Sequence, residues 1–217
     1  MHEWYAAPME GLTGWRWRQV QHEMFGRAAL YVTPFVSPNG NFSFQRKELE
    51  ELDPERNRGI PVVPQILTNR AEYFVWAAKE CRSRGWAQVD LNLGCPSGTV
   101  TGKKKGAGLL RQPELLRQLL DGIFDALPDM KISVKTRIGW ERAEEWPALL
   151  ALLETYPICR LTVHPRVRTQ FYKGTADREV FRWTAEHTAL PLCYNGDVTT
   201  VRDLWEMGEA FPDDAVM

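Results

Sequence analysis

Nearly continuous apolar runs alternate with amphipathic stretches along this chain of 217 residues. The apolar runs show little polar alternation, which is typical of parallel strands covered by helices on both faces. The pattern predicts strands at Trp4–Pro8, Ala28–Val36, Pro61–Leu67, Ala87–Leu93, Lys131–Arg137, Ile158–His164 and Pro191–Asn195. Asp213–Met217, after a turn at Phe211 to Asp213, reads as the start of one more strand.

The stretches between these runs predict helices. Pro113–Leu127 carries leucines at three- and four-residue spacing, and Pro113 suits a first helical turn. A second helix is predicted to begin at Asn69 as its N-cap, with Glu72 three residues later, and to turn Cys81 inward. Further helices are predicted at Trp15–Phe25, Glu144–Tyr156, Arg178–His187 and Thr199–Met207.

This alternation predicts an α/β fold, a (β/α)8 TIM barrel made of seven βα units and the start of strand eight. A complete barrel takes about 250 residues, so the barrel is expected to be incomplete at its C-terminal end. Unpaired strand edges would then favour self-association or domain exchange. An open doubly wound sheet is the alternative, although the chain has no GxGxxG motif. With no Gly/Ser linker, residues 1–217 read as one domain.

Composition narrows the function classes. A net charge of -1 argues against a protein coated in positive charge, and no apolar run reaches the roughly 18 residues of a membrane span. The N-terminus lacks a signal-peptide pattern, so a cytoplasmic location without membrane contact is expected. The four cysteines form no CxxC pair and no zinc spacing, so neither disulfides nor a metal site are expected.

Polar residues follow the predicted strands at the points where they end. In a parallel barrel these ends meet on one face, so the side chains are expected to share one mouth. A lone Lys or His at a strand end is usually a solvated rim residue, but the series is harder to dismiss. The residues are Gln65, Asn92, Cys95, Lys135, Arg137, His164, Arg166, Asn195, Gly196 and Asp197. They supply donors and cations and few carboxylates, which predicts an anionic, planar, electron-rich ligand.

Cys95 stands apart from the other cysteines. It follows a strand in the run NLGCP, and the basic, glycine-rich segment KKKGAGLL comes shortly after it. Cys81, Cys159 and Cys193 lie inside apolar segments and read as buried structural residues. A turn at a strand end would instead expose the Cys95 side chain above the barrel, where Lys103 to Lys105 would add positive charge if the loop folds back.

These motifs carry a resemblance. APMEG at 7–11, PQI at 64–66, DLNLGCP at 90–96, KKGAGLL at 104–110, SVKTRIGW at 133–140, TVHPR at 162–166 and YNGD at 194–197 occur in this order. The chain resembles the tRNA-dihydrouridine synthases over essentially its whole length. The resemblance implies a barrel that binds FMN and uses NADPH to reduce the C5=C6 bond of uridines in tRNA.

The resemblance also implies roles for individual residues. Cys95 resembles the proton donor, and Lys103 to Lys105 are expected to face tRNA phosphates. The implied flavin contacts are Pro8, Met9, Glu10, Gln65, Lys135 and His164, with Asn195, Gly196 and Asp197 on the phosphate side. Asn92, Arg137 and Arg166 are expected around the uracil ring or the flavin edge.

Elementary chemistry agrees with these roles. Hydride addition at C6 of uracil builds negative charge at C5, so an acid is needed on the opposite face of the base. A thiol with a pKa of about 8.5 stays protonated at neutral pH and can be that acid. The Lys135 cation would favour the anionic, reduced flavin over the neutral, oxidised one.

The sequence also departs from the resembled pattern. Relatives place a lysine near the position of Gly98, and Pro165 stands where a glycine usually follows the histidine. The family's GRG loop and helical tRNA-binding domain do not occur in these 217 residues, so a truncated catalytic domain is expected.

Two other functions stay open. One is a flavin-dependent reductase or dehydrogenase of a free pyrimidine, although such enzymes read NxSxPN or NLSCPH where this chain reads NLGCPSG. The other is a catalytically inert remnant that binds RNA or a partner. Flavin colour in the purified protein, followed by assays with tRNA and with free uracil or orotate, separates the three.

Overall fold

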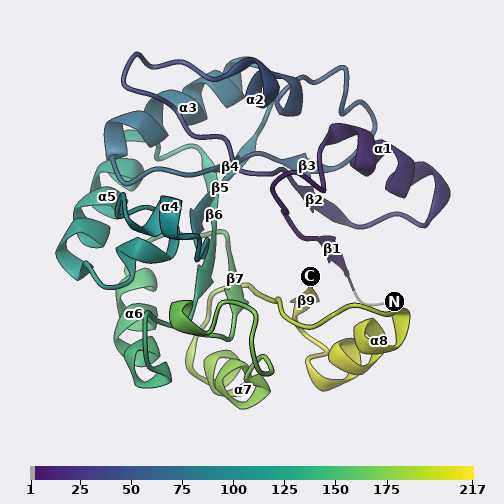
Figure 1. Ribbon diagram of the computed structural model, residues 1–217, viewed down its shortest axis with the longest axis vertical. Coiled ribbons are helices and arrows are strands. Elements are labelled where there is room, and N and C mark those ends of the chain that lie inside the picture. The colour runs from purple at the N-terminus through teal and green to yellow at the C-terminus, as the bar shows by residue number, and fades with distance from the viewer. Residues whose placement is uncertain (1–2) are drawn as a thin grey trace.

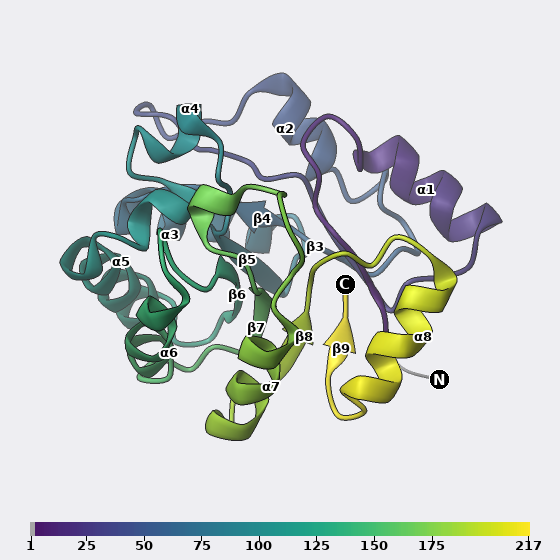
Figure 2. The ribbon, with the colours of Figure 1, turned by 60° about the horizontal axis from the view of Figure 1, so that its bottom comes forward.

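Parallel strands and helices alternate along the computed structural model, which describes residues 3–217 (Figure 1). The strands are β1 (Tyr5–Ala6), β2 (Leu30–Val32), β3 (Val62–Val63), β4 (Gln65–Ile66), β5 (Gln88–Leu93), β6 (Lys131–Arg137), β7 (Arg160–His164), β8 (Leu192–Tyr194) and β9 (Ala215–Val216). The helices are α1 (Trp15–Met24), α2 (Arg46–Glu51), α3 (Ala71–Ser83), α4 (Gly98–Thr101), α5 (Pro113–Ala126), α6 (Trp146–Leu153), α7 (Arg178–His187) and α8 (Val201–Ala210). Figure 2 shows the longer helices on the outside of a ring of strands.

The strands form two parallel sheets, one ordered β1-β2-β3 and the other β4-β5-β6-β7-β8-β9. Pro64 separates β3 from β4, since a proline has no N–H to donate to a neighbouring strand. Two isolated bridges, Val36 with Ile66 and Trp4 with Val216, join the sheets on both sides. The predicted barrel class is confirmed, with seven βα units followed by β9 as the start of strand eight.

The expectation of unpaired edges is wrong at the junction of the first and last strands. The Val216 N–H donates to the Glu3 carbonyl at 3.1 Å, and the Met217 N–H donates to the Tyr194 carbonyl at 2.7 Å. β9 is therefore hydrogen-bonded on both of its sides, so this junction leaves no unpaired strand edge that would favour self-association.

Some helix boundaries also differ from the prediction. Asn69 is not an N-cap: α3 begins at Ala71, and the Asn69 amide donates to the Lys103 carbonyl at 3.0 Å. The stretch predicted from Glu144 opens with a 3-10 turn, Ala143–Glu145, before α6. Thr200 caps α8 by accepting the Asp203 N–H, so that helix begins later and ends later than predicted.

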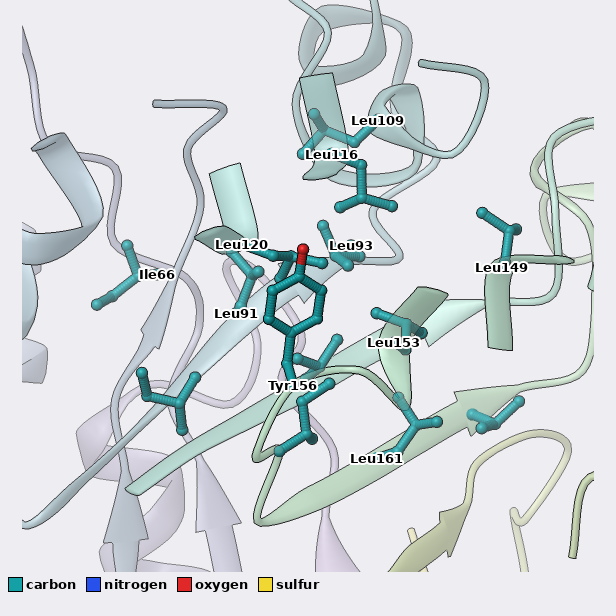
Figure 3. Packing of buried hydrophobic residues seen from close by; sticks show 14 of the residues in the cluster. Ile66, Leu91, Leu93, Leu109, Leu116, Leu120, Leu149, Leu153, Tyr156 and Leu161 are labelled. Carbon is teal, nitrogen blue, oxygen red and sulfur yellow. The ribbon is translucent and has the colours of Figure 1, made fainter. Parts of the chain in front are cut away.

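The core lies between the outer face of the sheet and the helices around it (Figure 3). Leu116 and Leu120 of α5 belong to this core together with Leu91 and Leu93 of β5, as the leucine spacing predicted. Cys81 and Cys193 are buried as expected, whereas Cys159 is only half-buried. Within residues 3–217 no helix has the length and hydrophobicity needed to cross a bilayer.

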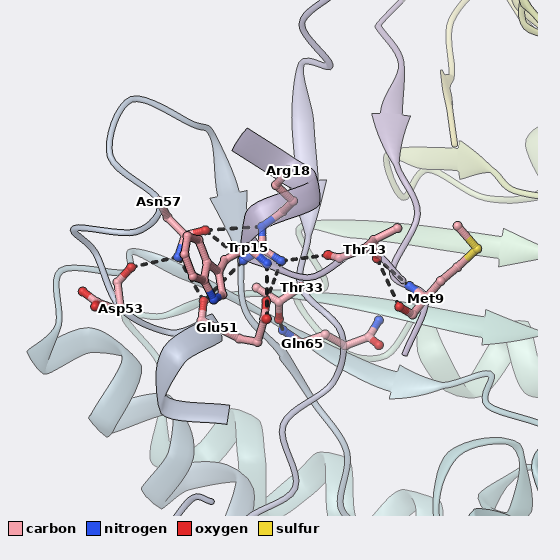
Figure 4. Close-up of polar contacts among 9 residues, drawn as sticks. All are labelled: Met9, Thr13, Trp15, Arg18, Thr33, Glu51, Asp53, Asn57 and Gln65. Atoms are coloured by element: carbon pink, nitrogen blue, oxygen red, sulfur yellow. Dashed lines mark hydrogen bonds and ion pairs between the residues drawn. The ribbon is translucent and has the colours of Figure 1, made fainter. Parts of the chain in front are cut away.

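A buried ion pair holds the segment after β1 in place (Figure 4). Arg18 of α1 has no exposed surface and forms a 2.8 Å ion pair with Glu51 of α2. Its guanidinium also donates to the Asn57 amide oxygen at 2.8 Å and to the Thr13 carbonyl at 3.0 Å. The Thr13 hydroxyl accepts the Met9 N–H at 2.8 Å. This cluster fixes the loop that carries residues 8–10 to the mouth of the barrel.

Candidate active site

A cavity of about 550 Å³ opens where the strands end. Nine of the residues singled out in the sequence line it: Pro8, Met9, Glu10, Gln65, Asn92, Cys95, Lys135, Arg137 and His164. They come from segments spread over more than 150 positions of the chain, yet the parallel strands deliver all of them to one place. Arg166, Asn195, Gly196 and Asp197 do not line this cavity.

The turn after β5 presents Cys95. The Asn92 side-chain oxygen accepts the N–H of Gly94 at 3.1 Å and the N–H of Cys95 at 2.9 Å. Gly106 packs beneath the turn with φ +54°, where an added Cβ would lie 2.9 Å from the Cys95 carbonyl oxygen. The glycine-rich segment therefore does fold back onto Cys95, and only a residue without a side chain fits there.

The Cys95 thiol is half-buried, and burial raises its pKa above the ordinary value. The charged groups that act on this pKa include Glu10, which raises it, and Arg137 and Lys135, which lower it. Lys105 is occupied elsewhere, because its ammonium donates to the Ser37 hydroxyl at 3.1 Å. The thiol is thus a neutral acid at neutral pH.

Lys135 brings a half-buried cation into the cavity. Burial is the main cause that lowers its pKa to about 8, and Arg137 lowers it further. Its ammonium donates to the Asn195 amide oxygen at 2.5 Å, and the Asn195 NH2 donates to the Met217 carbonyl at 3.1 Å. No carboxylate in residues 3–217 lies within ion-pair distance of Lys135. An anionic group in the cavity would give the Lys135 ammonium the charged partner that it lacks.

Arg137 ties the neighbouring loops together. Its guanidinium donates to the Gly94 carbonyl at 3.0 Å and to the Val167 carbonyl at 3.1 Å. It also lies 5.4 Å from the centre of the Tyr172 ring. Burial lowers its pKa to about 10, which leaves it charged at neutral pH. Arg137 is therefore a fixed positive charge whose hydrogen bonds connect the Cys95 turn to the loop after β7.

His164 is neutral, and its tautomer follows from its neighbour. Burial, followed by the charges of Lys135, Arg137 and Arg166, holds its pKa far below the ordinary value. An Arg166 N–H lies 3.0 Å from His164 Nε2. Since a guanidinium can only donate, Nε2 accepts, and the ring carries its proton on Nδ1.

Arg166 and Asp197 form a layer behind His164. One Arg166 nitrogen donates to both Asp197 oxygens at 2.8 Å and to the Gly174 carbonyl at 2.7 Å. Burial raises the pKa of Asp197, but hydrogen bonds from the Ala176 N–H and Arg166 lower it by more, to below its usual value. Arg166 therefore supports His164 from behind, which differs from the predicted position around a substrate or flavin edge.

Two aromatic residues at the mouth were not predicted from the sequence. Phe171 and Tyr172 line the cavity from the loop after β7, and Phe171 has a φ of +52°, which is uncommon for a bulky residue. The Arg168 guanidinium lies 4.6 Å from the Phe171 ring centre and 4.7 Å from that of Trp140. An adjacent Phe-Tyr pair shortly after a strand end was the available signal.

A larger hollow of about 760 Å³ lies beside this cavity, between the loops that follow β6 and β7. Its charged lining is mostly acidic: Glu141, Asp177, Glu179 and Asp197 against Arg178. Such a lining repels anions, so the smaller cavity with Cys95, Lys135 and Arg137 is the better candidate for chemistry.

The comparisons with known proteins agree on one family. Residues 5–217 match the family model described as dihydrouridine synthase. A "Probable tRNA-dihydrouridine synthase" of Rhizobium leguminosarum bv. phaseoli is 32% identical over 212 residues, covering 97% of this chain and 65% of that protein. tRNA-dihydrouridine synthase B of Proteus vulgaris is 31% identical over 195 residues, covering 89% of this chain and 59% of that protein. The chain thus spans less than two thirds of these relatives.

Solved structures support the fold. A variant of NCR from Zymomonas mobilis superposes with a TM-score of 0.64 at 14% identity, covering 99% of this chain and 80% of that chain. The N-acetylmannosamine-6-phosphate 2-epimerase of Clostridium perfringens gives 0.56 at 10% identity, covering 100% of this chain and 85% of that chain. At these identities the likeness concerns architecture alone.

Proposed function

The chain belongs to the dihydrouridine synthase family, and we propose that it catalyses the reduction of uridine to 5,6-dihydrouridine in tRNA. The observation that carries the proposal is a half-buried, protonated thiol, Cys95, in the same cavity as the half-buried cation Lys135. A proton donor and a cation for developing negative charge are what this reduction requires. We assign residues 1–217 to a catalytic domain that acts in the cytoplasm.

The donor set of the cavity fits FMN. Lys135 has N–H groups left for an anionic ring edge, Gln65 keeps one amide N–H and one oxygen lone pair, and His164 offers Nδ1–H. Pro8 and Met9 provide an apolar wall beside these polar groups. Asn195, Gly196 and Asp197 are proposed on the phosphate side. When bound and reduced by NADPH, FMN would supply the hydride for C6 of uracil.

Cys95 is proposed as the acid of the reaction. Its thiol would donate a proton to C5 of the uracil ring, on the face opposite the incoming hydride. The raised pKa keeps the thiol protonated at working pH and ready to donate. The turn held by Asn92 and Gly106 sets the direction from which the proton arrives.

Lys135 and Arg137 are proposed to offset negative charge. Lys135 would stabilise the anionic form of the reduced ring, and Arg137 would stabilise charge on a uracil carbonyl. Asn92, whose NH2 group donates a hydrogen bond to the Gln65 oxygen, is proposed at the edge of the uracil ring. Arg166 is proposed to act through His164 rather than on the substrate.

The test compares Cys95→Ala with Cys159→Ala, a substitution at a half-buried cysteine outside the cavity. In the complete protein, Cys95→Ala should bind FMN and accept electrons from NADPH, yet slow reoxidation by tRNA about 10²–10⁴-fold. Cys159→Ala should react like the wild type. Rapid mixing of reduced enzyme with tRNA measures both, and unchanged reoxidation in Cys95→Ala would remove the thiol from the mechanism.

A second measurement concerns the cofactor and the two alternatives. Lys135→Ala should weaken FMN binding or lower the flavin potential, because a cation beside the reduced ring is lost. A colourless wild-type protein that cannot be reconstituted with FMN would favour an inert RNA-binding role. Reoxidation by free uracil or orotate and not by tRNA would favour a reductase of free pyrimidines.

A further inference from the structure

A chain of side-chain amides runs beneath the Cys95 turn and ends on a buried carboxylate. Asp90 of β5 is 3% exposed and accepts a hydrogen bond from the Gln65 NH2 group at 2.8 Å. The Gln65 oxygen accepts from the Asn92 NH2 group at 2.7 Å. The Asn92 oxygen accepts the backbone N–H groups of Gly94 and Cys95.

Each amide in this chain has one allowed orientation. An ionised carboxylate only accepts, so Gln65 must turn its NH2 group toward Asp90 and its oxygen toward Asn92. Asn92 must then turn its NH2 group toward Gln65, which leaves its oxygen for the two backbone N–H groups. The acceptor at one end and the two donors at the other end demand the same arrangement.

The register of the sheet places these groups side by side. Gln65 pairs with Asp90 across β4 and β5, and Asp90 pairs with Ser133 across β5 and β6. The Ser133 hydroxyl donates to the second Asp90 oxygen at 2.7 Å. Burial raises the pKa of Asp90 to about 6, while the hydrogen bonds from Ser133 and Gln65 lower it, so the carboxyl is mostly ionised at neutral pH.

We propose that Asp90 is a positioning residue that acts through Gln65 and Asn92 to hold the Gly94–Cys95 backbone and so aims the Cys95 thiol. Without an acceptor at position 90, the Gln65 NH2 group would be buried and unpaired, which favours its rotation. Asn92 would lose the partner that fixes its own orientation. The N–H groups of Gly94 and Cys95 would then lose their acceptor.

Hydrogen exchange of the backbone amides of Gly94 and Cys95 tests this directly in the full chain. Asp90→Leu keeps the approximate shape and removes the acceptor, whereas Asp90→Asn can still turn an oxygen toward Gln65 and its NH2 group toward Ser133. We expect exchange at Gly94 and Cys95 to be at least tenfold faster in Asp90→Leu and close to wild type in Asp90→Asn. Ser133→Ala, which leaves the hydrogen bond between Gln65 and Asp90 in place, is the matched control and should not change exchange at Gly94 and Cys95.

Iodoacetamide alkylation gives a second readout. The Cys95 alkylation rate should rise in Asp90→Leu, with Cys159 of the same molecule as the reference thiol. Unchanged exchange and alkylation in Asp90→Leu would overturn the proposal, as would acceleration spread uniformly over the barrel. If Asp90→Leu does not fold, Gln65→Met interrupts the same chain at its centre, and normal exchange at Cys95 in that variant would overturn the proposal equally.

The catalytic meaning of this positioning rests on the proposed function, but the exchange measurement does not. If the wild type fails to reduce uridine and exchange still responds to Asp90→Leu, the proposed function fails and the hydrogen-bonded chain stands. If uridine is reduced and exchange does not respond, only the role of Asp90 is lost.

Discussion

Two regions of the molecule hold a positive charge away from the surface, Arg18 fully buried and Lys135 half-buried, and they give it partners in different ways. Arg18 forms an ion pair with Glu51, and its guanidinium also donates hydrogen bonds to Asn57 and Thr13. Lys135 has one hydrogen bond, to Asn195, and no carboxylate partner in the described residues. Burying a charge is costly unless partners replace the lost water. The Arg18 cluster is complete within the fold, whereas the surroundings of Lys135 become complete only with a ligand.

The largest effect on stability is expected from Arg18→Met. Removing the guanidinium leaves the Glu51 carboxylate, which is only 17% exposed, without its cation. The free energy of unfolding should fall by about 3–5 kcal/mol, as is usual when one member of a buried pair is lost. Urea unfolding measures this. Replacing both partners, Arg18→Met with Glu51→Leu, should cost less than Arg18→Met alone, and an equal or larger cost would show that the charge pair is not the cause.

Gly106→Ala comes next and tests how tightly the Cys95 turn is supported. The new Cβ would lie 2.9 Å from the Cys95 carbonyl oxygen and 3.0 Å from a Val100 methyl group. We expect a loss of about 1–3 kcal/mol, typical of overpacking, and slower uridine reduction. Gly98→Ala is the control, because its Cβ would meet nothing within 4 Å. Equal losses in both variants would mean that the close approach at Gly106 carries no strain.

Lys135→Met should be neutral or stabilising at pH 7, by about 1 kcal/mol, since an apolar side chain replaces an incompletely paired cation. The difference in stability between Lys135→Met and the wild type depends on pH. The folded-state pKa of Lys135 is about 8, below the unfolded value, so the cost of its charge is fully present below pH 8. As pH rises above 8, the folded protein loses this proton first and the cost is relieved.

The stability difference between Lys135→Met and wild type should therefore shrink between pH 8 and 10. Urea unfolding of both proteins at several pH values, at constant ionic strength, checks this. A Lys135→Met protein that is much less stable than the wild type at pH 7 would place Lys135 with Arg18 among the structural cations.

The smallest effect on stability is expected at the surface. Lys103 is exposed and forms no ion pair in the described residues, so Lys103→Ala should change stability by less than about 0.5 kcal/mol and leave flavin content untouched. If Lys103 contacts a tRNA phosphate, the affinity of Lys103→Ala for tRNA should fall. The slope of log affinity against log salt concentration should become less steep by about one unit. Loss of flavin in this variant would contradict the separation of roles between Lys103 and Lys135.

How far the sequence predicts this molecule depends on the range of the interactions involved. β6 has the predicted boundaries, Lys131–Arg137, because a strand leaves a local signature: Ile132 and Val134 are buried and are separated by Ser133, which points to the other face of the sheet. The prediction of an N-cap at Asn69 is wrong because the Asn69 side chain donates a hydrogen bond to the Lys103 carbonyl, 34 residues away. No local pattern reveals such a contact. Thr200 was read as an interior position, although it caps its helix.

The same limit applies to the candidate site. Gln65, Cys95 and Lys135 could be predicted as site residues because they follow the ends of predicted strands, and a parallel barrel brings these ends together. Position along the chain could not tell whether Arg166 points at a ligand or back at Asp197, because this depends on the fold of the loop after β7. Phe171 was missed for a related reason, since its position at the mouth depends on the path of the same loop.

The bridge between Trp4 and Val216 bears on how the molecule folds. These residues lie near opposite ends of the described chain, so their pairing closes the longest loop in the sheet and carries the largest closure entropy. β5, β6 and β7 pair over shorter separations and through longer registers, so they are placed to form the early nucleus. The seam beside β9 then closes late, and substitutions there should speed unfolding while leaving the folding rate almost unchanged.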